Sequence, residues 1–72
     1  MIKFTLIIWV CSFLGGQMCM PPIESPVLYD SWYECSRAAH KESLKMMSNL
    51  GYEVVNKSQI AMKYRCKEAL SI

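Results

Sequence analysis

The residues of this chain that could do chemistry are one histidine, four cysteines and a pair of carboxylates near residue 30. His40 could serve as a general base or activate a nucleophile only with a hydrogen-bonding partner, and no motif in the sequence presents one. Asp30 and Glu34 have the spacing of paired acid–base groups, but at a helix start such residues typically interact with the cap and the helix dipole. We therefore predict no catalytic residue and no enzymatic activity.

A zinc site could be counted from three cysteines and the histidine, namely Cys19, Cys35, Cys66 and His40. Two ligands on one face of a helix need a spacing of three or four residues. Cys35 and His40 are five residues apart and would lie about 140° from each other around the helix axis. We expect neither a metal nor a cofactor.

Charge is modest, with charged residues at 19% and a formal net charge of +2 at pH 7. This balance argues against an electrostatic nucleic-acid binder, so we expect no nucleic acid as a partner. The clearest basic strip has glutamates close by, and we interpret it as a solvated face. It comprises Lys57, Lys63, Arg65 and Lys67.

The first sixteen residues have the pattern of a targeting segment. Lys3 supplies a positive start, and residues 4–14 form an eleven-residue apolar run before two glycines. A run of this length suits a secretory signal, whereas a transmembrane helix needs about 20 apolar residues. We predict a signal peptide over residues 1–16, cleaved after Gly16, with an uncleaved membrane anchor as the alternative.

Both the cleaved signal and the uncleaved anchor place the rest of the chain on the far side of the membrane from the cytoplasm. We expect a periplasmic or secreted protein whose membrane contact, through residues 2–14, is transient; the alternative is an inner-membrane-anchored protein. Removing residues 1–16 leaves three of the four cysteines, in a compartment that permits disulfides. A domain this small generally needs a covalent or oligomeric contribution to its stability.

The rest of the chain divides into a lead-in and a small stapled domain over residues 28–72. Residues 17–27 contain three prolines and predict an extended lead-in. A helix is expected over about residues 30–50, because Ser31 is followed three residues later by a glutamate in a capping box and Gly51 is a helix stop. Whether the helix extends to residue 56 stays open.

The C-terminal segment is ambiguous. Over residues 59–66 apolar and polar side chains alternate with a period of two, which predicts a half-buried strand. Because several of these residues are also good helix formers, an antiparallel helical hairpin is the alternative. The expected fold class is mostly α: one long helix, a C-terminal strand and a disulfide staple.

The spacing of the cysteines favours one bridge in either architecture. In a hairpin that turns at Gly51, Cys35 and Cys66 lie level with each other, and a returning strand also brings Cys66 within about one helical turn of Cys35. We predict a Cys35–Cys66 disulfide. Cys19 is then left over, which indicates a free thiol or an intermolecular bridge.

A strand over residues 59–66 requires a pairing partner for its backbone groups. Residues 18–20 could supply a short ladder within the chain. The other candidate is a strand from a second copy or from a different protein. We therefore expect an unknown protein partner or a homodimer.

Several short motifs follow one another along the chain. They are the signal, Cys-x-Pro-Pro at 19–22, YDSWYEC at 29–35, Val-Val-Asn-Lys at 54–57 and Lys-Tyr-x-Cys at 63–66. In this order the chain resembles small signal-peptide-bearing proteins of marine bacterial viruses. The resemblance implies no activity, and it implies a bacterial envelope as the setting.

Together these features predict a small exported, non-enzymatic interaction or accessory module of the cell envelope or extracellular space. The alternative is a membrane-anchored small protein with an uncleaved N-terminal helix. A secreted toxin-like peptide is less favoured, because such peptides usually carry a strongly cationic face.

Overall fold

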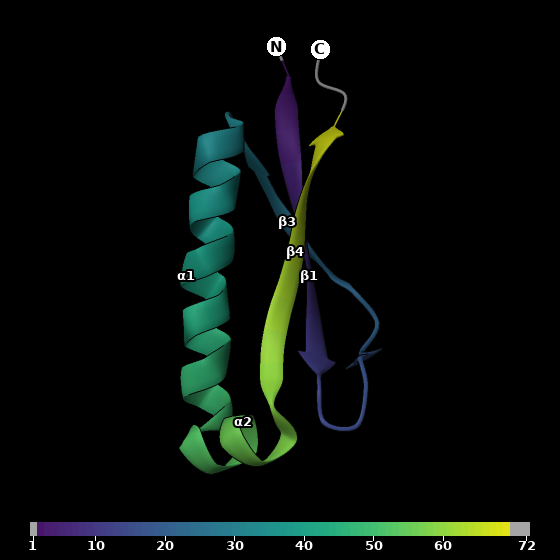
Figure 1. Ribbon diagram of the computed structural model, residues 1–72. Coiled ribbons are helices and arrows are strands. Elements are labelled where there is room, and N and C mark those ends of the chain that lie inside the picture. Colours follow the sequence, from purple (N-terminus) through teal and green to yellow (C-terminus); the bar gives the residue numbers. More distant parts are fainter. Residues whose placement is uncertain (1, 70–72) are drawn as a thin grey trace.

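The computed structural model describes residues 2–69, which form an antiparallel sheet with one long helix against one of its faces (Figure 1). Strands account for 43% and helices for 38% of the structure, so the mostly-α prediction is wrong. The error arises because three strands precede the helix. In chain order the elements are β1 (Lys3–Ser12), β2 (Met18–Cys19), β3 (Ile23–Tyr29), α1 (Trp32–Leu50), α2 (Tyr52–Ser58) and β4 (Ile60–Ala69).

The central strand of the sheet is β1. β4 pairs with it along its whole length, from Lys3 opposite Ala69 to Ser12 opposite Ile60. β3 and β2 follow one another along the other edge of β1, and all three pairings are antiparallel. The residues for which the sequence predicts a signal peptide or anchor thus supply the strand with which the other three pair.

The composition of β1 suits this central position. It is rich in β-branched and aromatic side chains, which favour strands, and it contains neither glycine nor proline. Both of its edges are paired, and it carries apolar residues on both faces: Leu6 and Ile8 are buried under α1, whereas Ile7 and Trp9 on the other face are half-buried. Within residues 2–69, no helix combines the length and apolar composition that a bilayer crossing requires.

The long helix starts and stops where local signals place its ends. The Ser31 hydroxyl accepts a hydrogen bond from the Glu34 N–H at 3.1 Å and so caps the first turn. At the other end Gly51 has a φ of 90°, a value that L-residues with a side chain rarely adopt, and its N–H donates to the Met47 carbonyl. α1 therefore corresponds to the helix expected over about residues 30–50.

The chain does not form a second long helix after Gly51. The short helix α2 ends at Gln59, whose left-handed conformation turns the backbone into β4. β4 extends from Ile60 to Ala69, so the alternative of a helical hairpin is also wrong. Its alternation follows the expected period of two, because every second residue faces α1 from the sheet.

The core lies between α1 and the sheet. Its buried side chains come from β1, α1 and β4, and they are Leu6, Ile8, Cys35, Ala39 and Cys66. Leu6 is directly opposite Cys66 in the β1–β4 ladder, so the even-numbered residues of both strands face the helix. Within α1 only Cys35 and Ala39 are fully buried, so the C-terminal half of the helix contributes no fully buried residue.

Candidate functional site

Two disulfides hold the elements of the structure together. Cys35 of α1 is bonded to Cys66 of β4, with Cα atoms 6.1 Å apart, and both side chains are buried. This is the pair that the sequence predicts. Cys11 of β1 is bonded to Cys19 of β2, directly across their short ladder.

Cys19 is therefore bonded within the chain in this structure, and it is neither a free nor an intermolecular thiol. The sequence reasoning missed this bond because it assigned Cys11 to a segment that would be removed. The signal that could have found it is the even number of cysteines in the full chain. Two disulfides indicate an oxidising environment.

The bond between Cys11 and Cys19 closes a small exposed loop over residues 13–17. Gly15 and Gly16 both have positive φ there. A Cβ atom at either position would have no other group within 4 Å. The cleavage point predicted after Gly16 lies inside this loop, between the two bonded cysteines. A chain cut at that point after folding keeps its two parts joined by the disulfide.

The candidate acid–base residues make local structural contacts. His40 lies on the exposed flank of α1, where Nδ1 is 2.8 Å from the Ser36 carbonyl oxygen. Asp30 forms an ion pair with Lys3, and Glu34 lies in the capped first turn of α1. Within the described part of the chain, no three His, Cys, Asp or Glu side chains are grouped in a way that could hold a metal ion.

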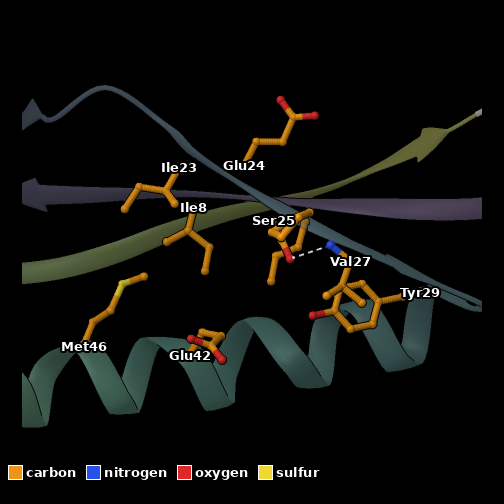
Figure 2. Close-up of a pocket in the computed structure, with 10 residues that line it drawn as sticks. Ile8, Ile23, Glu24, Ser25, Val27, Tyr29, Glu42 and Met46 are labelled. Carbon is orange, nitrogen blue, oxygen red and sulfur yellow. Dashed lines mark hydrogen bonds between the residues drawn. The ribbon is translucent and has the colours of Figure 1, made fainter.

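A groove runs between α1 and β3 on the helix-covered side of the sheet. It consists of two adjacent hollows, one of about 300 Å³ and one of about 320 Å³. Ile23 and Met46 line both hollows. Figure 2 shows Ile8, Ile23 and Met46 directed into the space between helix and strands. The Cys35–Cys66 bond joins α1 to β4, and α1 packs more extensively against β1 and β4 than against β3.

We call this feature the α1–β3 groove and define it by six of the apolar residues that line it: Leu6, Ile8, Val10, Ile23, Met46 and Leu50. Its wall on the β3 side is irregular, because the β1–β3 register shifts between Thr5 and Ile7. The polar side chains along it include Glu42 and Asn49 of α1. An apolar lining with a few polar side chains is suited to holding an apolar ligand.

Neither the protein-family models, nor the curated proteins, nor the solved structures include a match to this chain.

Proposed function

We propose that this protein is a small exported, non-enzymatic interaction module that binds an apolar segment of a partner protein in the α1–β3 groove. The observation that carries the proposal is the apolar lining of the groove beside exposed apolar residues. Ile23, at the junction of its two parts, is 52% exposed, and Met20 and Leu50 continue the apolar surface beyond it. Contiguous exposed apolar surface on a small protein is typical of interaction sites.

The export part of the proposal is supported by the two disulfides and by the apolar segment near the N-terminus. Structural disulfides persist in the periplasm and outside the cell, and they are rare in the cytosol. We further propose that residues 1–16 direct export and then stay in the folded protein. β1 supplies core residues such as Leu6 and Ile8, and Cys11 is covalently bonded to the chain beyond the loop.

A protein segment is the occupant that the composition of the groove favours. The two hollows share Ile23 and Met46 as lining residues, so they are adjacent, and together they form an elongated site rather than a single closed cavity. Glu42 and Asn49 stand along the helix side, where they can bind backbone N–H groups or a cation of the occupant. An apolar face with flanking polar contacts is the common composition of helix-in-groove recognition.

The test is site-specific photo-crosslinking in cells that export the protein. A photoreactive amino acid at Met46, inside the groove, should give one discrete protein adduct after irradiation. The matched control is the same amino acid at Leu44, which is on the same helix but 67% exposed and outside the groove lining. We expect the Leu44 variant to lack this adduct.

A substitution in the groove lining completes the experiment. Ile23→Asp introduces a charge into the apolar lining and should reduce the Met46 adduct at least tenfold while the protein level stays unchanged. An adduct at twice the mass of the chain would identify a second copy as the occupant. Equal adducts at Met46 and Leu44, or no adduct at Met46, would contradict the proposal.

A further inference from the structure

The face of the sheet opposite α1 has its own chemistry. Because the β1–β4 register is unbroken, the odd-numbered residues of both strands share this face. We call it the open sheet face, and its central residues are Ile7 and Trp9 of β1 and Lys63, Arg65 and Lys67 of β4. The three basic side chains are exposed, and Lys67 is opposite Thr5 across the ladder.

Positive charge dominates this face. Lys63, Arg65 and Lys67 form one row along β4, with successive members about 6.6 Å apart as alternate residues of a strand. The register puts Glu24 of β3 on the same face, across β1 from Arg65. Lys3, at the end of the face, is already paired with Asp30.

The helix carries a comparable number of basic residues but in a different setting. Arg37, Lys41 and Lys45 are exposed on α1, and Glu34 and Glu42 belong to the same helix. The strand row also has two glutamates near it, namely Glu24 across β1 and Glu68 on β4 itself. The helix row therefore provides a matched control, since each row consists of three basic side chains with two glutamates nearby.

The centre of the open sheet face is aromatic and apolar. The Lys63 ammonium lies 5.4 Å from the ring centroid of Trp9, its direct cross-strand neighbour. Ile7 is next to Trp9 on this face. Tryptophan rings favour the boundary between water and lipid headgroups, and lysine and arginine are attracted to anionic headgroups.

We propose that the open sheet face binds the headgroups of an anionic lipid bilayer, with the three basic residues on phosphates and Trp9 at the headgroup level. The charge complementarity of the β4 row and the position of Trp9 beneath it carry this proposal. It is independent of the α1–β3 groove, which lies on the other face. The face is less suited to single-stranded nucleic acid, because sheet platforms for bases present two or three stacking aromatics, and here Trp9 is the one aromatic residue of β1 and β4 on this face.

Vesicle flotation tests the proposal with the oxidised full chain at low salt. Vesicles of phosphatidylcholine with one quarter phosphatidylglycerol should carry the protein to the top of the gradient, and pure phosphatidylcholine vesicles should not. Lys63→Gln, Arg65→Gln and Lys67→Gln together should weaken binding about a hundredfold, since each basic residue near an anionic surface contributes about fivefold. Raising the salt to about 0.5 M should release the wild-type protein.

The control variant combines Arg37→Gln, Lys41→Gln and Lys45→Gln on α1. Both triple variants lower the formal net charge by the same amount, so a non-specific attraction would weaken equally in the two. We expect the helix variant to lose less than threefold. Equal losses in both variants, or no binding of the wild type to anionic vesicles, would overturn the proposal.

Tryptophan fluorescence locates the contact. In a Trp32→Phe background, the emission of Trp9 should shift to shorter wavelength when anionic vesicles are added. A shift confined to Trp32, measured with Trp9→Phe, would contradict the proposal. So would binding to a single-stranded oligothymidine at the same salt that depends on the β4 row and exceeds the binding to vesicles.

Discussion

One side-chain hydrogen bond joins the helix to the C-terminal strand. The hydroxyls of Ser36 and Tyr64 are 2.7 Å apart in a partly buried setting, although they are 28 residues apart in sequence. The Tyr64 ring also packs edge-on against His40, with ring centroids 5.4 Å apart. At this scale Tyr64 contacts two side chains of α1, Ser36 by its hydroxyl and His40 by its ring.

Replacing Tyr64 by phenylalanine should remove the hydrogen bond and keep the ring. We expect Tyr64→Phe to lower the free energy of unfolding by about 1 kcal/mol, the usual contribution of one such bond. Urea denaturation of the oxidised protein measures the change. Ser36→Ala should cost a similar amount, and the double variant should lose little more than either single variant. Fully additive losses would show that the two hydroxyls are not coupled.

At the scale of the elements, each disulfide fixes a different pair. Cys35–Cys66 joins α1 to β4 across a sequence separation of 31 residues, whereas Cys11–Cys19 joins β1 to β2 across only 8. The long bond holds together the two layers that enclose the core. The short bond secures the hairpin at the end of the sheet.

The two bonds should therefore contribute unequally to stability. In the chain-entropy model the long loop corresponds to about 3.5–4 kcal/mol and the short loop to about 2.5 kcal/mol. We expect Cys35→Ala with Cys66→Ala to lower the denaturation midpoint more than Cys11→Ala with Cys19→Ala. Equilibrium unfolding of both double variants checks the order, and a larger loss from the short bond would refute it.

At the scale of the whole molecule, the order of the strands makes the N-terminal segment indispensable to the fold. β1 lies between β4 on one side and β3 with β2 on the other (Figure 1). Without residues 1–16 the remaining strands have no common partner, and a sheet edge left unpaired inside the structure is costly. A secretory signal that is removed and a folded protein of this architecture are therefore mutually exclusive outcomes for one molecule.

A cut in the exposed loop at residues 13–17 tests whether the N-terminal segment is held covalently in the folded protein. We expect a protease site inserted between Gly15 and Gly16 to be cleaved in the oxidised, folded protein. Both pieces should stay together under denaturing, non-reducing conditions, and separate after reduction, because Cys11–Cys19 joins them. Intact mass spectrometry before and after reduction gives the result.

The control for this experiment is the same insertion with Cys11→Ala and Cys19→Ala, which should separate on denaturation without a reductant. A chain that begins at residue 17 should show no cooperative melting transition, since it lacks the central strand. A cooperative melt of that shortened chain would contradict the requirement for β1.

Local signals in the sequence were sufficient for the middle and the end of the chain. Ser31 and Gly51 bound α1 because capping and helix termination depend on residues within one or two turns. The alternation over residues 59–66 predicted β4, since one face of that strand packs against the helix and the other faces water. The cysteine spacing indicated the Cys35–Cys66 pair for the same reason, because helix rise and strand rise are fixed distances.

The tertiary structure alone decided the role of residues 3–12, and with it the fold class. A short apolar run has no periodicity that separates a signal helix from a strand with apolar residues on both faces, because its conformation depends on what surrounds it. In this structure β4, β3 and β2 provide backbone partners on both edges, and α1 covers one face. These partners are distant in sequence, so the sheet, and with it the Cys11–Cys19 bond, follows from the packing of the whole chain.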